Sequence, residues 1–204
     1  MGTLKLDPTH RAAVSDMLEG SAAAIQACQR LVDDITTAAE RIADAFERGH
    51  KLLVCGNGGS AADAQHFAGE LMGRFLASAS ERAPRPAIAL STDTSVLTCI
   101  ANDYTYADVF ARQVRGLGQA GDILVGITTS GSSPNVLRAF EVAGTLDVFR
   151  MALCGPGGRI AELADLALCV PYAGTAAIQA AHITIIHAMC MVLEDRFASP
   201  RRQL

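Results

Sequence analysis

His66 and Glu70 stand four residues apart in a segment with helical periodicity. Residues four apart on a helix face the same way, so this imidazole and this carboxylate can meet one ligand. Together they could bind a metal ion, or act as a general acid and a general base. An exposed His–Glu pair with no catalytic or metal-binding role has the same spacing, so the spacing alone leaves that interpretation open.

More polar side chains lie in the longest helical pattern, at residues 175–197. Gln179 and His187 fall within an arc of about 80° and stand about 12 Å apart along the helix axis, so they can share one centre only if it lies between them. His182 points about 140° away from His187. We expect His182 to pack in the core or to support a neighbouring ligand.

A glycine turn follows the apolar run at residues 51–55 and leads into the helix that carries His66. Its backbone N–H groups can face an anion, and Asn57 and Ser60 can add side-chain hydrogen bonds. Ser60 stands where an N-cap residue belongs. The turn has neither the lysine of a Walker loop nor the spacing of a dinucleotide fingerprint, so we expect no nucleotide cofactor.

A second loop, at residues 128–133, is rich in hydroxyl groups and is followed by Pro134. Proline favours the first turn of a helix, so the hydroxyls surround a helix N-terminus and form a neutral cradle for phosphate. Asn102 and Asp103 could accept hydrogen bonds from a polyol, although a helix end and turn would explain them equally well. Glycine and serine also mark ordinary loops, but two such loops at one sheet edge favour a ligand site.

Five short, continuously apolar runs imply the fold, at residues 51–55, 86–90, 122–127, 149–154 and 166–170. Continuous apolarity indicates strands covered on both faces, and helical segments between them imply a parallel sheet inside an α/β sandwich. Two helices are expected before it, at 7–26 and 31–46, with Gly49 closing the second. The last helix is apolar on most of its circumference, which predicts burial and a subunit interface.

The composition narrows the class of protein. A net charge of −4 argues against nucleic-acid binding by bulk charge. No run of about 20 apolar residues and no signal-peptide core are present, so we expect a cytoplasmic protein without a membrane partner. Six scattered cysteines indicate small core residues in a reducing compartment. We expect the polar tail at 199–204 to be frayed.

Five motifs, taken in order, resemble those of the sugar-isomerase (SIS) domain family, and within it the phosphoheptose isomerases. They are Cys55-Gly-Asn-Gly-Gly-Ser-Ala-Ala-Asp-Ala-Gln-His-Phe-Ala-Gly-Glu-Leu71, Ser91-Thr-Asp-Thr-Ser95, Ala101-Asn-Asp-Tyr104, Thr128-Thr-Ser-Gly-Ser-Ser-Pro-Asn135 and Ile178-Gln-Ala-Ala-His182. The resemblance implies one SIS domain over residues 1–204, folded as a three-layer αβα sandwich of flavodoxin-like type with a five-stranded parallel sheet. Helices at 1–48 would serve packing and assembly, and residues 49–197 would form the sugar-phosphate-binding core. The resemblance also implies a homotetramer with active sites at subunit interfaces.

The resemblance implies a reaction as well: D-sedoheptulose 7-phosphate is converted to D-glycero-D-manno-heptose 7-phosphate, toward ADP-heptose for lipopolysaccharide or other heptosylated products. Glu70 and His187 match the acid–base pair. The residues that match zinc ligands are His66, Glu70, Gln179 and His187. Those that match substrate contacts are Asn57, Gly58, Gly59, Ser60, Glu70, Asn102, Asp103, Thr128, Thr129, Ser130, Ser133 and Gln179, with the hydroxyl loop holding the phosphate.

Two departures from the family pattern concern substrate preference. Thr128 stands where serine is common, and the strand at 149–154 lacks the usual Thr-Gly ending. Two other functions stay open: an isomerase of another sugar phosphate, and a non-catalytic relative such as the factor that binds the bacterial replication initiator. Those relatives lack the counterparts of Glu70 and His187, so the presence of both favours an enzyme.

Overall fold

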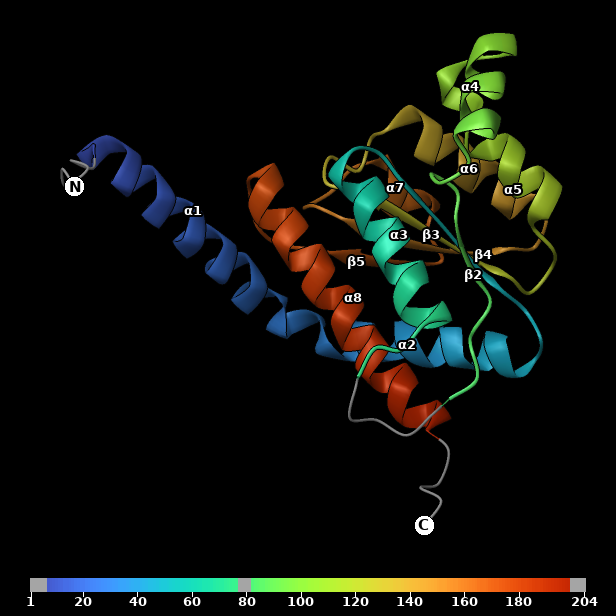
Figure 1. Cartoon of the computed structure of the whole chain (residues 1–204), viewed down its shortest axis with the longest axis horizontal. Coiled ribbons are helices and arrows are strands. Elements are labelled where there is room, and N and C mark those ends of the chain that lie inside the picture. The colour runs from blue at the N-terminus through green and yellow to red at the C-terminus, as the bar shows by residue number, and fades with distance from the viewer. Residues whose placement is uncertain (1–6, 77–81, 199–204) are drawn as a thin grey trace, which may run out of the picture.

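The computed structural model describes residues 7–76 and 82–198, and the expected fraying of the tail at 199–204 lies outside them. One parallel sheet with strand order β2-β1-β3-β4-β5 forms the centre of the fold (Figure 1). Its strands are β1 (Leu52–Gly56), β2 (Ala87–Ala89), β3 (Ile123–Thr128), β4 (Phe149–Cys154) and β5 (Leu166–Cys169). The predicted parallel sheet is confirmed, with each strand within one or two residues of its apolar run.

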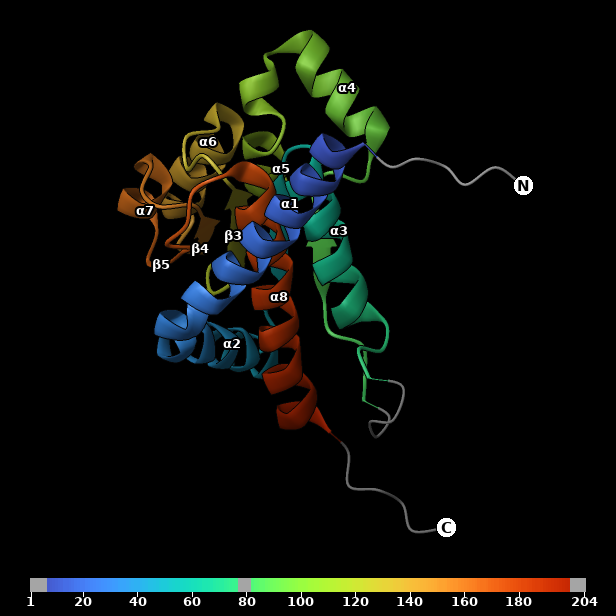
Figure 2. The same ribbon diagram turned by 90° about the vertical axis from the view of Figure 1, so that its left-hand side faces the viewer.

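Helices cover both faces of this sheet and complete the predicted αβα sandwich. They are α1 (Pro8–Ala27), α2 (Val32–Glu47), α3 (Gly59–Met72), α4 (Thr94–Asp103), α5 (Ala111–Leu117), α6 (Pro134–Gly144), α7 (Arg159–Leu163) and α8 (Thr175–Phe197), with short 3-10 turns η1 (Cys28–Leu31) and η2 (Tyr106–Asp108). Figure 2 shows α1, α2, α3 and α8 on one side and α4 to α7 on the other. Gly49 ends the second helix at φ +83°, as expected.

Alternate residues of each strand pack into two separate hydrophobic cores. Leu52 and Val54 of β1 point to the layer that holds α2, α3 and α8, whereas Leu53 and Cys55 point to the layer that holds α4 to α7. Since successive side chains on a strand face opposite ways, a strand buried on both sides must be apolar throughout. This requirement explains the continuous apolar runs.

The central strand β3 allows a very close helix contact through Gly126. A Cβ atom at this position would come within 2.4 Å of the ring of Phe140 on α6. The absence of a side chain therefore lets α6 pack directly on the sheet. This contact fixes the helix whose first turn borders the hydroxyl loop.

The long helix α8 owes its apolar composition to its position in the fold. By length and composition it could cross a membrane, but half of the relevant stretch is buried inside the protein. It contacts α1, α2 and α3, and the buried side chains include His182 and Glu194. A helix packed from several sides needs apolar residues around its circumference, so burial accounts for the pattern.

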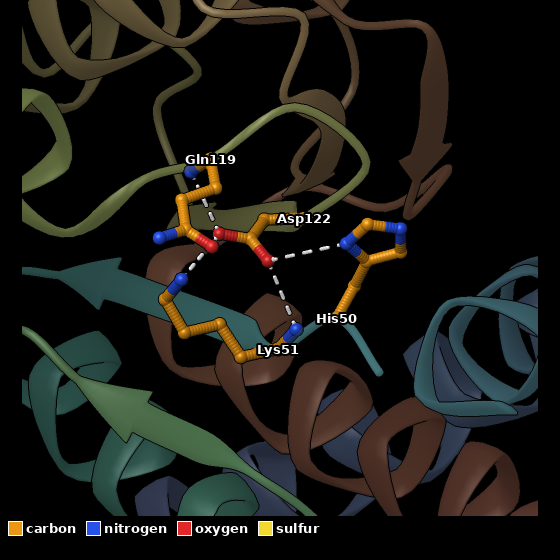
Figure 3. A network of polar contacts seen from close by, with 4 residues as sticks. All are labelled: His50, Lys51, Gln119 and Asp122. Carbon is orange, nitrogen blue, oxygen red and sulfur yellow. Dashed lines mark hydrogen bonds and ion pairs between the residues drawn. The ribbon is translucent and has the colours of Figure 1, made fainter. Parts of the chain in front are cut away.

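Asp122 ties the amino ends of β1 and β3 together (Figure 3). Its buried carboxylate accepts hydrogen bonds from the Lys51 N–H at 3.0 Å, the Lys51 ammonium at 2.6 Å and the Gln119 N–H at 2.8 Å. The His50 Nδ1 atom lies 3.9 Å away. The ion pair and the main-chain bonds satisfy a carboxylate that burial would otherwise disfavour.

We expect Asp122→Asn to destabilise the protein by about 3 kcal/mol, because a neutral amide leaves Lys51 without its counter-charge. Glu141→Gln is the matched control, since Glu141 pairs with Arg159 at a distance of 3.3 Å on the surface and such pairs contribute about 0–1 kcal/mol. Urea unfolding at one protein concentration measures both changes. Equal losses for the two variants would contradict the assigned role of Asp122.

Candidate active site

The two ligand-binding loops expected from the sequence leave the same edge of the sheet. Strands β1 and β3 are direct neighbours, with Gly56 beside Ile127 at their carboxyl ends. Ligands of open parallel sheets collect at this edge, outside the carboxyl ends of the strands. The glycine turn and the hydroxyl loop are therefore adjacent, as predicted.

The glycine turn enters α3 through two glycines, each with its own physical reason. Gly58 has φ +56° and ψ −121°, which a residue with a side chain rarely adopts. A Cβ atom at Gly59 would fall 1.9 Å from Nε2 of Gln179 on α8. Gly58 thus makes the turn, and Gly59 lets the two helices approach.

The expectation that Ser60 caps this helix is wrong. Gly58 occupies the cap position and Ser60 is the second residue of α3, with its N–H donating to the Asn57 carbonyl at 3.0 Å. Ser60 is also buried. Because Gly58 turns the chain with its positive φ, the helix starts earlier than the position of Ser60 suggests. The residue types of a capping motif do not reveal this backbone angle.

Asn57 is held by two partners that the sequence analysis did not assign. Its side-chain amide exchanges two hydrogen bonds of 2.8 Å with the amide of buried Asn135 on α6, and its Oδ1 accepts a third, of 3.1 Å, from the Tyr106 hydroxyl. These contacts join the glycine turn to α6 and η2. Asn135 lies inside the quoted loop motif, but a pattern of hydroxyls gave no reason to select it.

Three of the four predicted hydroxyls converge at the start of α6. The Thr128 Oγ1 atom lies 3.3 Å from the Ser130 Oγ atom and 2.9 Å from the Ser133 Oγ atom, while Thr129 makes no such contact among the described side chains. Pro134 is the first residue of the helix, as predicted. Hydroxyl donors at a helix N-terminus suit the oxygens of a phosphate group.

His66, Glu70 and His187 form a compact group between α3 and α8, which lie side by side in Figures 1 and 2. The two Nε2 atoms of His66 and His187 are 2.9 Å apart, and Nε2 of His66 lies 3.2 Å from Oε1 of Glu70. All three side chains reach solvent in part. The expected shared face of His66 and Glu70 is confirmed, and His187 joins it from the other end of the chain.

This group fits a zinc ion by the chemistry of its donor atoms. One ligand atom from each of the three residues lies within 4.8 Å of the other two. Imidazole nitrogen and carboxylate oxygen bind Zn²⁺ at about 2.0–2.2 Å, which places ligand atoms of one tetrahedral ion about 3.3 Å apart. Three protein ligands leave a position for water or substrate, as in catalytic zinc sites.

Gln179 is turned toward α3, against Gly59 and Asp63. Burial raises the pKa of Asp63, and a hydrogen bond from Gln179 and the proximity of His66 oppose that rise. Asp63 is a polar residue that the sequence analysis missed. It precedes His66 by three residues, so helical spacing could have placed it on the same face.

The remaining predicted side chains lie apart from this group. Asn102 and Asp103 end α4, where, within the described residues, Asn102 donates to Asp103 at 2.9 Å and Cys99 contacts the same carboxylate. His182 is fully buried, which lowers its pKa to about 4 although the Cys154 backbone opposes the shift. A neutral His182 in the core agrees with the packing role expected for it.

Comparison with known proteins identifies the family. The SIS domain model matches residues 18–155. The phosphoheptose isomerase of Geotalea daltonii is 50% identical over 175 residues, which cover 85% of this chain and 90% of that protein. The solved phosphoheptose isomerases of Neisseria gonorrhoeae and Francisella tularensis are 45% and 38% identical, with TM-scores of 0.84 and 0.86, and each comparison covers 91% of this chain and 98% of the other.

The family model covers the first four strands, both loops and α3, and each structural match covers 91% of this chain. The fold expected from the sequence is thereby confirmed as the SIS fold. The chain belongs to the SIS domain family and, within it, to the phosphoheptose isomerases.

Proposed function

We propose that this protein interconverts D-sedoheptulose 7-phosphate and D-glycero-D-manno-heptose 7-phosphate. The observation that carries the proposal is the contact of His66 and Glu70, on the helix that the glycine turn opens, with His187 on α8. It is supported by about 50% identity to proteins named phosphoheptose isomerase. An aldose–ketose isomerase needs an acid, a base and a phosphate cradle; Glu70 and His187 would supply the first two, and the hydroxyl loop the third.

The chemistry requires a proton to leave the carbon beside the ketose carbonyl and another to reach the former carbonyl carbon. Glu70 would take the first proton, and the His187 imidazole would donate to the carbonyl oxygen, giving a cis-enediol. Return of a proton from Glu70 to the former carbonyl carbon, with loss of the proton on the terminal hydroxyl to His187, would give the aldose and restore both groups. Glu70 on α3 would serve the carbon, and His187 on α8 would serve the oxygen.

A zinc ion held by His66, Glu70 and His187, with Gln179 as the fourth expected ligand, would stabilise negative charge on the substrate oxygen. Glu70 would then serve both as ligand and as base. Because a carboxylate bound to a cation is a weaker base, these two roles limit each other. The amide of Gln179 also contacts Gly59 and Asp63, so it would have to bind the metal while keeping those contacts.

The two loops would hold the substrate. The hydroxyl loop would bind the phosphate through Thr128, Thr129, Ser130 and Ser133, and the turn formed by Asn57, Gly58, Gly59 and Ser60 would contact the sugar with Gln179. Since the Asn57 side chain is already bonded to Asn135 and Tyr106, its contribution would come from the backbone. Asn102 and Asp103 would meet the hydroxyls of the sugar chain.

We further propose a homotetramer with active sites at its interfaces. Helix α1 lies against α8 and extends beyond the sheet, and its apolar residues Val14, Met17 and Leu18 are more than half exposed (Figure 1). This face would be covered by another subunit, consistent with an assembly role for residues 1–48 and substrate binding by 49–197. The product would enter ADP-heptose synthesis in the cytoplasm, for lipopolysaccharide or another heptosylated product.

Turnover of sedoheptulose 7-phosphate in deuterated buffer, followed by NMR, tests the proposal. Aldose formation with deuterium at carbon 2 is the expected result. No turnover by a folded, zinc-supplied oligomer would contradict it and favour a different sugar phosphate or a partner-binding role.

We expect Glu70→Gln and His187→Ala each to lower kcat by about 10²–10⁴-fold, because each removes one proton-transfer group. The same NMR assay measures the loss, and size-exclusion chromatography checks the assembly. Glu162→Gln, an exposed change on α7, is the matched control and should retain activity. Near-normal kcat in either folded variant would refute the acid–base assignment.

Ser130→Ala should raise KM about tenfold with a smaller effect on kcat, because it removes one hydroxyl donor from a phosphate cradle of several. Steady-state kinetics with sedoheptulose 7-phosphate measure both constants. Ser132→Ala provides the control from the same loop, since its hydroxyl bonds to the Ser130 carbonyl. An unchanged KM for Ser130→Ala would place the phosphate elsewhere.

Zinc removal should abolish turnover if the histidines and Glu70 bind a catalytic ion. Dialysis against a chelator, followed by addition of Zn²⁺, is expected to remove and then restore kcat. A protein that stays fully active with less than a tenth of an equivalent of metal, measured by atomic emission, would show that the acid–base pair acts alone.

A further inference from the structure

A buried ion pair links Glu194 of α8 to Arg82, which follows α3 in the sequence, close to the candidate active site. Nε of Arg82 donates to Oε2 of Glu194 at 2.5 Å, and their side chains are only 4% and 5% exposed. Buried charges of this kind cost solvation energy unless they are paired and fully hydrogen-bonded. Such a pair therefore calls for an explanation beyond simple packing.

The rest of the Arg82 guanidinium caps the helix that carries Glu70. Its NH2 group donates to the main-chain carbonyl of Glu70 at 2.6 Å, and its NH1 group donates to that of Leu71 at 2.9 Å. Both carbonyls belong to the last turn of α3, where a helix has no N–H groups of its own to satisfy them. A cation at this end also complements the helix dipole.

Glu194 lies on the face of α8 that carries His187. The two residues are seven positions apart, about two helical turns, with Cys190 between them. Burial raises the pKa of the Cys190 thiol to about 12, and Glu70, Arg82 and Glu194 all lie near enough to contribute. The three charged groups and His187 therefore follow one seam between the two helices.

We propose that Arg82 and Glu194 are positioning residues, which hold the last turn of α3 against α8 so that the Glu70 carboxylate faces His66 and His187. Arg82 fixes the backbone of Glu70 itself, and Glu194 anchors Arg82 to the helix of His187. This inference rests on the catalytic role proposed above for Glu70. Neither residue contacts the sugar-binding loops in the described structure, so their removal should misplace the base and leave phosphate binding intact.

The double variant Arg82→Met/Glu194→Met separates positioning from stability. Replacing both members of a buried pair by apolar residues of similar volume is often neutral for folding, whereas removing one leaves an unpaired charge. We expect the double variant to remain folded, with kcat about 10- to 100-fold lower and KM within about twofold, because a misplacement of about 1 Å at a reacting group has an effect of this size. A purely structural pair would leave kcat unchanged in the folded protein.

The matched control is Arg196→Met/Glu47→Met, which removes another ion pair of α8. Nε of Arg196 lies 2.9 Å from Oε1 of Glu47 on α2, and both side chains are nearly half exposed. This control should keep kcat and KM. If Arg82→Met/Glu194→Met does not fold, Arg82→Lys serves the same purpose, since lysine keeps the charge beside Glu194 but cannot reach both carbonyls.

A second readout is independent of the reaction. The affinity for Zn²⁺, measured by competition with a chromophoric chelator, should fall about tenfold in the double variant and stay unchanged in the control. Wild-type kcat in a folded double variant would overturn the proposal. If the wild type itself does not convert sedoheptulose 7-phosphate, the proposed function fails, and the Zn²⁺ affinities then decide: an unchanged value in the double variant overturns the positioning role.

Discussion

The packing of α3 against α8 is the contact on which the candidate site depends. Helix α3 follows the first strand, whereas α8 ends the described chain, so their contact unites residues more than a hundred positions apart. Gly59 makes the approach close enough for Gln179, and the same seam continues through His66, Glu70 and His187. Neither helix alone brings His66, Glu70 and His187 together.

The layers around the sheet could be predicted from the local sequence, because buried strands and helices need apolar residues at characteristic spacings. Five apolar runs became five strands, and the glycine after α2 ended that helix. The spacing of His66 and Glu70 likewise determined their common face, since helical geometry relates residues over a single turn. Predictions of this kind succeed where the interaction lies within one element.

Features that depend on distant contacts could not be obtained in this way. The cap position at Gly58 follows from a backbone angle, and the amide pair of Asn57 and Asn135 depends on β1 and β3 being neighbours. Arg82 reaches the end of α3 from a segment without periodicity, so nothing in its local sequence marks it. The resemblance to a family supplied the roles of individual residues, which spacing had left open.

The two ligand loops also connect the two hydrophobic cores of the protein. The hydroxyl loop leads into α6 on one face of the sheet, whereas the glycine turn leads into α3 on the other. A sugar phosphate bound to both would bridge the layers through its own covalent skeleton. Its binding free energy would then add to the free energy of unfolding of the whole sandwich. The enzyme saturated with substrate would therefore be more stable than the free enzyme.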